Sequence, residues 1–287
     1  MIPDSVKIAI KEKTGLMITG SRNVHGGSIN QAAMVVAGKK SFFLKWNHAV
    51  PENFFEKETE GLNALRQADH DIIIPNVIAT GEAGGSGITF LLMEYIDSSD
   101  TGDSFNFGAE LAQLHLNQSD RFGFHSDNFI GSLHQSNRNQ DRWKDFFHSE
   151  RLLPQLKLAV DTGKIEYRIM NHLEKLYSRL DDLLPAAKPS LLHGDLWGGN
   201  YLFNVDGNAV LIDPAVYYGH PEMDLAFSKM FGGFTKDFYR GYESVSPLEP
   251  GFNERISVYN LYPLLVHVNL FGRSYVAQVR AILQNYS

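Results

Sequence analysis

One polar segment, His193 to Asn200, constrains the fold more than any other part of the chain. It reads HGDLWGGN and lies between two apolar runs, SLL and YLF. Short apolar runs bounded by turn residues are typical of buried strands. Gly198 and Gly199 allow the backbone to reverse between them. The pattern therefore predicts a tight polar loop that leads from one strand into the next.

The residues after this loop predict a small hairpin, because YLFNVDGNAVLIDP has two apolar runs around Asp206 and Gly207. Near the N-terminus, QAAMVVAG and KSFFLKWN predict a larger hairpin with its turn at Gly38 and Lys39. NVIATGEAGGSGITFLLMEYI predicts a strand, a solvent-exposed glycine-rich turn and a second strand. Between these lies PENFFEKETEGLNALRQA, whose Phe55, Leu62 and Leu65 recur at helical spacing.

The chain changes character at the polar segment DSSDTGDS. Beyond it, amphipathic helices are predicted in FNFGAELAQLHLNQ, RWKDFFHSERLLPQLKLAV, YRIMNHLEKLYSRLDDLLP and the tail after residue 254. We therefore predict an α+β protein with two lobes. Residues 1–97 form a small β-rich lobe with one helix, and residues 98–287 form a larger, mainly helical lobe.

Composition excludes several classes of protein. The chain has no Cys, so disulfides, thiolate chemistry and Cys-based zinc sites are excluded. A formal charge of −7 without a basic stripe argues against nucleic-acid binding. No apolar run reaches the roughly 18 residues of a membrane span, and the start does not resemble a secretion signal. We expect a cytoplasmic protein, monomeric or weakly dimeric.

Three side chains around the hairpin carry oxygen ligands: Asp195, Asn200 and Asp213. Each alone is more often a turn residue than a functional one. Together, on a loop and an adjoining hairpin, they can converge on one Mg²⁺, which prefers carboxylate and carbonyl oxygens and commonly binds beside substrate phosphates. This spacing favours phosphate chemistry.

HGDLWGGN followed by LIDP resembles the catalytic loop and metal-binding segment of the aminoglycoside phosphotransferase-like kinases, relatives of the protein kinases. The strings IDPAVYYGHPEMDLA, FGGF, RLLPQL and LYPLLVHVNLFG are similar to segments of the fructosamine kinase (ketosamine-3-kinase) family. The resemblance covers nearly the whole chain. It implies a bilobal protein-kinase-like fold, ATP and Mg²⁺ as cofactors, and phosphorylation of a ketosamine, free or on a glycated protein side chain, at its C3 hydroxyl, a reaction associated with deglycation.

A kinase also needs a strand Lys that contacts the ATP phosphates and pairs with a helix Glu. Lys45 in FFLKW suits the first role. Glu58 suits the second because it shares the apolar helix face, where an unpaired carboxylate would be costly. Glu60 is the alternative, although it lies off that face.

The remaining nucleotide contacts are placed by the resemblance. Gly26, Gly27 and Ser28 of HGGSIN would approach the phosphates, although a plain turn is an equal alternative. Backbone groups of Glu94 and Ile96 in LLMEYID would hydrogen-bond the adenine.

For mechanism, Asp195 is the expected base for the acceptor hydroxyl, and Asn200 and Asp213 are the expected metal ligands. His193 and Asp224 are expected to brace the loop. Asp224 follows Asp213 by only eleven residues, which leaves no room for a long peptide-docking segment and favours a small acceptor.

Trp197, Tyr217 and His220, with Tyr218, are candidates for the acceptor pocket, and Trp197 could equally fill the core. GFHSDNFIGSLHQSN resembles a family segment near the acceptor side. The resemblance makes candidates of Asn128, Gly131 and Asn137, although loop-bracing roles are equal alternatives.

Two other functions stay open at this point. One is a related small-molecule kinase acting on an aminoglycoside, choline or a sugar. The other is a nucleotide-binding pseudokinase, which the presence of Lys45, Asp195, Asn200 and Asp213 disfavours.

Overall fold

The computed structural model describes residues 1–24 and 29–286, and these form two compact units. The first unit contains residues 1–67, 72–103 and 199–214, and the second contains residues 68–71, 104–198 and 215–287. The boundary predicted at residue 97 lies close to the end of the second stretch of unit 1. The predicted division differs from these units at three places, because residues 68–71 belong to unit 2, and residues 98–103 and 199–214 belong to unit 1.

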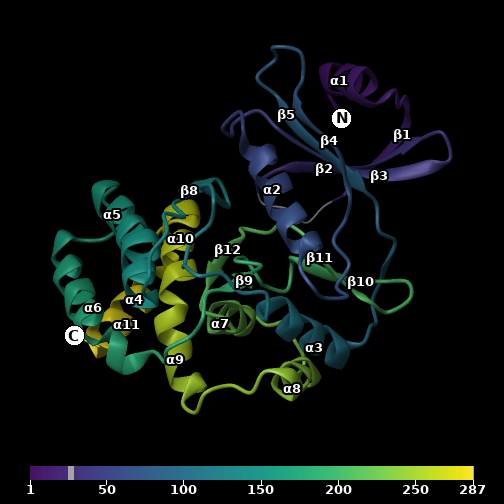
Figure 1. Ribbon diagram of the computed structural model, residues 1–287. Coiled ribbons are helices and arrows are strands. Elements are labelled where there is room, and N and C mark those ends of the chain that lie inside the picture. The colour runs from purple at the N-terminus through teal and green to yellow at the C-terminus, as the bar shows by residue number, and fades with distance from the viewer. Residues whose placement is uncertain (25–28, 287) are drawn as a thin grey trace. The chain divides into compact units, whose positions relative to one another are not determined.

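Unit 1 is built on a five-stranded antiparallel sheet with the strand order β1-β2-β3-β5-β4 (Figure 1). The strands are β1 (Ile18–Asn23), β2 (Gln31–Ala37), β3 (Lys40–Asn47), β4 (Val77–Glu82) and β5 (Thr89–Glu94). The hairpin predicted around Gly38 and Lys39 is present, since Ala37 pairs with Lys40. The glycine-rich turn between β4 and β5 is exposed at Gly84 and Gly85, as predicted.

Strand alternation gives β3 two different faces. Leu44 and Trp46 point into the apolar cluster that helix α1 (Asp4–Thr14) also joins. Because successive side chains of a strand point to opposite faces, Lys45 lies on the other side of the sheet. Helix α2 (Phe54–Gln67) packs on that side, as Figure 1 shows. The sequence of β3 thus delivers one charged side chain to α2.

Helix α1 was not predicted from the sequence. Its buried residues Val6, Ala9 and Ile10 have the i, i+3, i+4 spacing of a helix that covers an apolar surface. Gly15 ends it with φ 73°, and its N–H donates to the carbonyl of Lys11 (2.8 Å). The sequence therefore contains the helical spacing, but the buried apolar residues within the helix cover only about one turn.

The hairpin of residues 199–214 belongs to unit 1 through its strand pairing. Strand β10 (Tyr201–Asn204) pairs with β11 (Ala209–Leu211) and with β6 (Ser98–Ser99). Ile73 adds to the edge, since its N–H donates to Ala209 (2.9 Å). The predicted turn at Asp206 and Gly207 is present.

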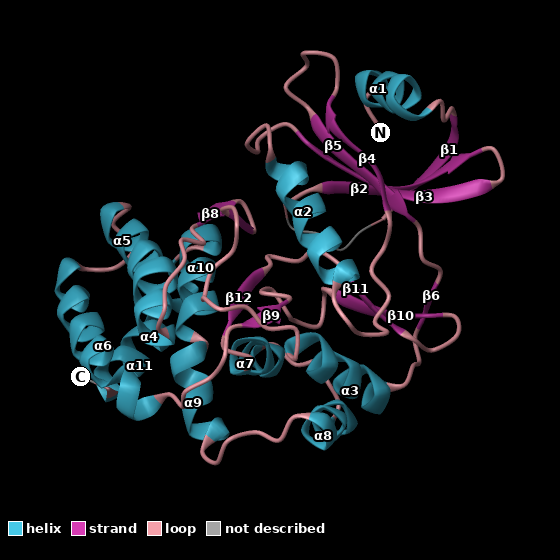
Figure 2. Ribbon diagram, in the orientation of Figure 1, coloured by secondary structure: helices cyan, strands magenta, loops and turns pink. Residues whose placement is uncertain are grey.

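Unit 2 is mainly helical (Figure 2), as predicted for this part of the chain. Its α-helices are α3 (Ser104–His115), α4 (Trp143–Phe146), α5 (Leu153–Asp161), α6 (Met170–Leu183), α7 (Glu222–Met230), α8 (Lys236–Val245), α9 (Phe252–Tyr259), α10 (Leu261–Phe271) and α11 (Val276–Asn285). Shorter helical turns are the π-helical η1 (Phe147–Leu152) and the 3₁₀ turns η2 (Tyr167–Ile169) and η3 (Arg273–Tyr275). Two small strand pairs complete it, β7 (Asn128–Ile130) with β8 (Leu133–Gln135) and β9 (Ser190–Leu192) with β12 (Tyr217–Gly219).

Helices α3 and α8 cross at two glycines. A Cβ on Gly108 would lie 1.8 Å from the carbonyl oxygen of Phe238, and one on Gly241 would lie 1.9 Å from that of Phe105. Real Cβ atoms do not approach so closely, so the two backbones meet here without intervening side chains. This crossing fixes α3, whose last residue, His115, contacts Asp224 of α7 (3.3 Å).

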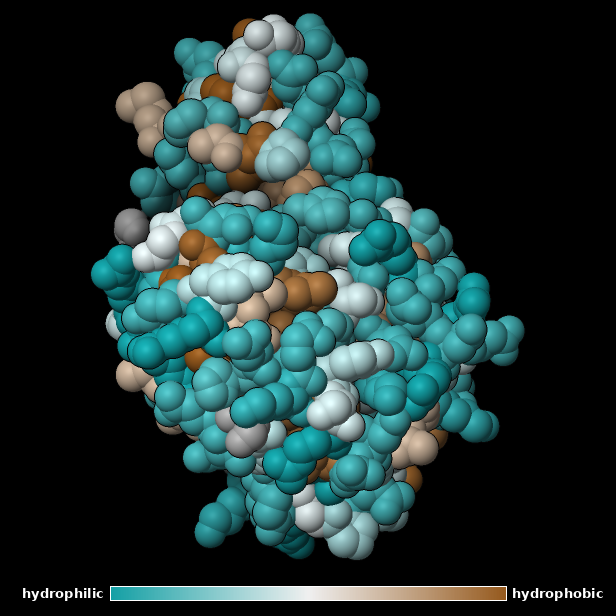
Figure 3. Space-filling model, turned by 90° about the vertical axis from the view of Figure 1, so that its left-hand side faces the viewer, coloured by the Kyte–Doolittle hydropathy of each residue, from teal (hydrophilic) through white to brown (hydrophobic). Residues whose placement is uncertain are grey.

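The face seen in Figure 3 is mostly hydrophilic, and hydrophobic side chains appear there in small separate groups. Scattered apolar side chains of this kind are normal on a protein surface. Within residues 1–24 and 29–286, no helix has the length and apolar character needed to cross a bilayer.

Candidate active site

Lys45 lies at the centre of a buried ion cluster in unit 1. Its Nζ is 2.7 Å from Glu58 Oε1, and it also forms an ion pair with Asp213. The predicted pair between Lys45 and Glu58 is therefore present, whereas Glu60 pairs with Lys57 on the helix surface (2.9 Å). Burial disfavours the charge on Lys45, but Asp213 and Glu58 outweigh it and raise the pKa of the amine. Lys45 is a permanent cation here.

The two carboxylates of this cluster differ in their environment. Burial raises the pKa of Glu58, and Lys45 opposes that effect. The Asp213 side chain is 38% exposed, against 10% for Glu58 and 5% for Lys45. Only Asp213 thus has oxygen accessible to a ligand from outside the cluster.

The hairpin brings Asn200 beside Asp213. Tyr201 pairs with Leu211, and the N–H of Ile212 donates to the carbonyl of Asn200 (3.0 Å). Asn200 therefore lies opposite the residue that precedes Asp213. Asp213 has φ 56°, the single non-glycine residue in the left-handed region within the described chain. Such backbone outliers cluster at functional sites.

This pair of residues suits a hard cation that also binds phosphate. Asp213 supplies a carboxylate and Asn200 an amide oxygen, which are ligand types of Mg²⁺. Among the residues that the structure describes, no cluster of three His, Cys, Asp or Glu side chains could hold a metal by itself.

In unit 2, the loop that carries Asp195 is held by Asp224. The Asp224 carboxylate accepts hydrogen bonds from the backbone N–H groups of His193 (2.8 Å) and Gly194 (3.0 Å). His193 Nδ1 in turn accepts the N–H of Asp195 (3.3 Å). The bracing contacts expected for His193 and Asp224 are thus both present. His115 adds a contact to Asp224 (3.3 Å) from α3.

Gly194 is required by this loop for two reasons. Its φ is 81°, a conformation that residues with a Cβ rarely adopt. A Cβ would also lie 2.1 Å from the carbonyl oxygen of Ala215. The backbones are close at this point because the N–H of Ala215 donates a hydrogen bond to the carbonyl of His193 (2.9 Å).

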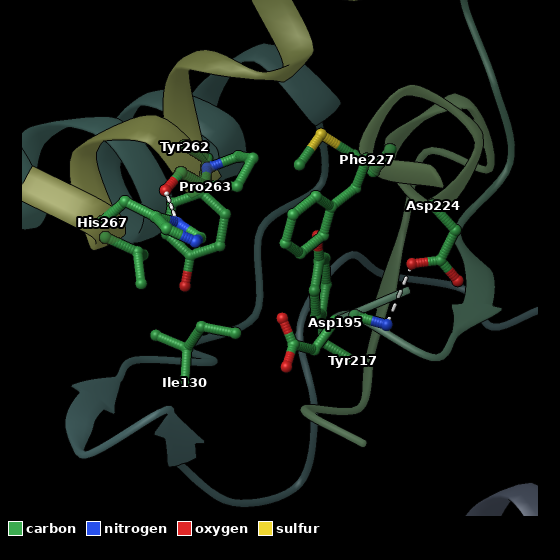
Figure 4. A pocket seen from close by; sticks show the side chains of 11 residues that line it. Ile130, Asp195, Tyr217, Asp224, Phe227, Tyr262, Pro263 and His267 are labelled. Carbon is green, nitrogen blue, oxygen red and sulfur yellow. Dashed lines mark hydrogen bonds between the residues drawn. The ribbon is translucent and has the colours of Figure 1, made fainter. Parts of the chain in front are cut away.

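Asp195 opens onto a pocket with largely apolar walls. Figure 4 shows its carboxylate directed toward the space between Ile130 and Tyr262. The lining residues, which all belong to unit 2, are Ile130, Gly194, Asp195, Tyr217, Met223, Asp224, Phe227, Tyr262, Pro263, Val266 and His267. Of the two lining carboxylates, Asp224 is 1% exposed and committed to the backbone. Asp195 is therefore the charged group that a ligand would meet.

The acceptor-pocket candidates fall in different places. Tyr217 lines the pocket, and burial raises its pKa to about 12. Trp197 is absent from the lining and lies edge-on to Phe231, with ring centroids 6.4 Å apart. His220 is also absent from the lining. It is buried between Trp143 and Tyr259, and burial lowers its pKa to about 3. Tyr218 pairs with Leu191 in the β9–β12 pair.

The segment GFHSDNFIGSLHQSN has bracing contacts at each of the three positions singled out. Asn128 donates to the carbonyl of Val216 (2.8 Å), and Asn137 donates to that of Ser126 (3.1 Å). Gly131, with φ 58°, forms the turn between β7 and β8. The segment supplies Ile130 to the pocket wall.

The structure describes only some of the residues predicted to contact the nucleotide. Gly26, Gly27 and Ser28 lie outside the described residues. Glu94 ends β5, and its N–H donates to the carbonyl of Asn76 (2.8 Å). Because the Glu94 N–H is already used, the backbone groups predicted to bind adenine are the Glu94 carbonyl and the N–H and carbonyl of Ile96.

Several pocket residues were missed by the sequence analysis, above all Phe227, Tyr262 and His267. Tyr262 and His267 belong to LYPLLVHVNLFG, which had been noted only as a family string. Helix α10 is apolar on nearly all sides, since eight of its eleven residues are buried. Hydrophobic periodicity therefore could not indicate which face borders the pocket.

Solved structures with the same fold include phosphotransferases. The structure superposes on an aminoglycoside phosphotransferase in complex with ADP and hygromycin B with a TM-score of 0.65, 18% identity and 98% of each chain covered, a similarity that concerns the fold alone. It superposes more closely on a Thermobifida fusca protein assigned as a fructosamine-3-kinase, with a TM-score of 0.87, 29% identity and 99% of each chain covered.

Sequence comparison then identifies the family. The sequence profile described as fructosamine kinase matches residues 3–287. A "probable ketoamine kinase" of Enterococcus faecium is 38% identical, with 92% of this chain and 94% of the relative covered. A chloroplastic protein-ribulosamine 3-kinase of Arabidopsis thaliana is 35% identical over 96% of this chain and 85% of the relative. The chain belongs to the fructosamine kinase family. It is a kinase, and family and fold imply that it uses ATP.

Proposed function

We propose that this protein transfers the γ-phosphoryl group of ATP to the C3 hydroxyl of ketosamines, free or on glycated protein side chains. The observation that carries the proposal is the position of Asp195, an accessible carboxylate at a pocket with apolar and aromatic walls. Such walls suit the carbon faces of a sugar derivative, while the carboxylate suits a hydroxyl. The names of the relatives in the family support the same acceptor class.

Unit 1 contributes the nucleotide end of the reaction. Lys45, held between Glu58 and Asp213, would contact the phosphates, and Gly26, Gly27 and Ser28 would cover them. Asp213 and Asn200 would hold Mg²⁺, which supplies neutralisation of phosphate charge when it is bound. The backbone groups of Glu94 and Ile96 would bind the adenine.

Unit 2 contributes the acceptor end. Asp195 would orient the hydroxyl and accept its proton as the new P–O bond forms. Its position depends on the backbone hydrogen bonds that its loop donates to Asp224, so the geometry of the loop prepares it. Tyr217 would form part of the acceptor wall. Trp197 and His220, which do not line the pocket, would act through packing against Phe231 and Trp143, respectively. Along the chain, only four residues separate Asp195 from Asn200.

The pocket composition separates ketosamines from polycationic acceptors. An aminoglycoside carries several ammonium groups and needs several carboxylates. Among the described residues that line the pocket, Asp195 is the carboxylate available to a ligand. A ketosamine carries one amine and several hydroxyls, and therefore needs no further acidic group.

The proposal is tested by phosphate transfer from labelled ATP to a ribulosamine, a fructosamine and kanamycin. We expect product with the ketosamines and none with kanamycin, and we expect phosphate on C3 by NMR. Asp195→Asn should lower kcat by several orders of magnitude while ATP binding is retained. Turnover of kanamycin alone, or normal turnover by Asp195→Asn, would contradict the proposal.

A further inference from the structure

A network of buried amides lies behind the pocket wall and joins it to a buried arginine. Its members are Gln135 (1% exposed), Asn128 (6%), Asn137 (1%) and Arg151 (0%). These residues come from β7, β8, the segment after β8 and the π-helical turn η1. The sequence strings that contain them resembled family segments, yet the phosphoryl-transfer chemistry above uses none of them.

Main-chain carbonyls determine the orientation of two of these side-chain amides, Asn128 and Gln135. Asn128 Nδ2 lies 2.8 Å from the carbonyl oxygen of Val216, which can only accept. The Oδ1 atom of Asn128 is therefore on the other side, where it accepts from Gln135 Nε2 (2.7 Å). Gln135 Nε2 also donates to the carbonyl of Ala215 (3.1 Å). Both amides are thus oriented by main-chain carbonyls.

Arg151 fixes the far end of the network. A guanidinium only donates hydrogen bonds, so Asn137 must turn its Oδ1 toward Arg151 (2.7 Å) and its Nδ2 toward Asn128 Oδ1 (3.0 Å). The guanidinium carbon also lies 3.9 Å from the ring centroid of Tyr217, a residue of the pocket wall. A π-helical turn, which is rare and often found at functional sites, presents this side chain.

The orientation of Gln135 determines what the Tyr262 hydroxyl can do. With Nε2 committed to Asn128 and Ala215, the Oε1 atom of Gln135 lies 2.5 Å from the Tyr262 oxygen and must accept. A phenol has one proton, and that proton goes to Gln135. Burial raises the pKa of Tyr262, so the hydroxyl is protonated at neutral pH. What Tyr262 offers to a ligand is an oxygen lone pair.

We propose that Tyr262 determines acceptor specificity by accepting a hydrogen bond from a hydroxyl of the ketosamine other than the one that is phosphorylated. Tyr262 and Asp195 line the same pocket, and each offers an acceptor oxygen to a ligand there. A ligand rich in O–H and N–H donors matches such a pocket, whereas one that presents only acceptors leaves it unpaired. Gln135 and Arg151 are positioning residues that act through Tyr262. This inference rests on the proposed ketosamine kinase activity.

The test compares the unaltered protein with Tyr262→Phe on a ketosamine and on its monodeoxy analogues, each lacking one hydroxyl other than that on C3. We expect Tyr262→Phe to lower kcat/KM about tenfold on the complete acceptor, with KM for ATP unchanged. On one analogue, which lacks the group that donates to Tyr262, the two proteins should have equal kcat/KM. An equal loss on all analogues, or no loss on any, would overturn the inference. A lack of turnover by the unaltered protein on every ketosamine would instead overturn the proposed function and the inference with it.

A second variant tests the role of the network. Gln135→Leu removes the acceptor of the Tyr262 proton, so the hydroxyl can rotate and donate. The preference for the complete acceptor over the sensitive analogue should then fall about tenfold, while KM for ATP is unchanged. Gln113→Leu, at an exposed position on α3, is the matched control and should keep the preference. A normal preference in Gln135→Leu would show that Gln135 does not position Tyr262.

Discussion

Asp224→Asn tests whether the catalytic loop is positioned by one carboxylate. The Asp224 oxygens accept two backbone N–H groups, from His193 and Gly194. An Asn in the same place keeps one acceptor oxygen and turns an NH₂ group toward the second N–H. One buried hydrogen bond to a charged group is lost, which costs about 1.5–3 kcal/mol of folding free energy. We expect the free energy of unfolding to fall by about that amount.

Asp224→Asn should also slow catalysis. Asp195 follows Gly194 directly, so a shift of the loop moves the base. A displacement of about 1 Å can reduce rate about 100-fold. We expect kcat to fall about 100-fold at a temperature where both proteins are fully folded, with KM for ATP unchanged. Steady-state kinetics and urea unfolding measure the two quantities.

Asp206→Asn is the matched control, because Asp206 is exposed at the tip of the β10–β11 hairpin. It makes the same chemical change without touching the catalytic loop, and both kcat and stability should stay normal. A normal kcat in Asp224→Asn, with or without a loss of stability, would show that this carboxylate does not position Asp195.

Three further predictions concern other parts of the molecule. Gly108→Ala should destabilise the protein by about 3 kcal/mol or more in urea unfolding, because its Cβ would overlap the Phe238 carbonyl; Gly20→Ala, whose Cβ would have ordinary contacts, should not. The neutral, buried His220 has a pKa of about 3 in the folded protein and about 6.5 when unfolded, so unfolding takes up a proton below pH 6.5. Stability should fall by up to about 1.4 kcal/mol per pH unit from pH 6.5 toward pH 3, and a shallower slope in His220→Phe would verify the source. Lys45→Met should abolish ATP binding measured by calorimetry; retained binding would contradict the role given to Lys45.

The sequence was most informative where the side-chain pattern and the chemistry agree. Lys45 could be paired with Glu58 because a Glu on an apolar helix face needs a partner. The loop after β9 could be recognised because Gly, Asp and Asn interrupt apolar strands. The two-lobed α+β architecture followed from the change in periodicity near residue 100.

The remaining features depend on contacts that no local pattern encodes. Helix α10 is almost entirely buried, so periodicity could not select Tyr262 or His267 as pocket residues. His220 was chosen for its place beside the family motif, yet tertiary packing puts its ring against Trp143 and Tyr259. Asn137 is oriented by Arg151 and donates in turn to Asn128. Arg151 is distant from the loop of Asp195 in sequence, so no local pattern indicates this network.

The composition of unit 1 from three separate stretches of chain has a consequence for synthesis and for engineering. Strand β6 and Ile73 have their partners in residues 199–214. A ribosome must therefore deliver most of unit 2 before unit 1 can be completed. Neither unit can be excised, swapped or expressed alone as a continuous fragment, and a gene cut near residue 103 would separate Lys45 from one of its two carboxylates.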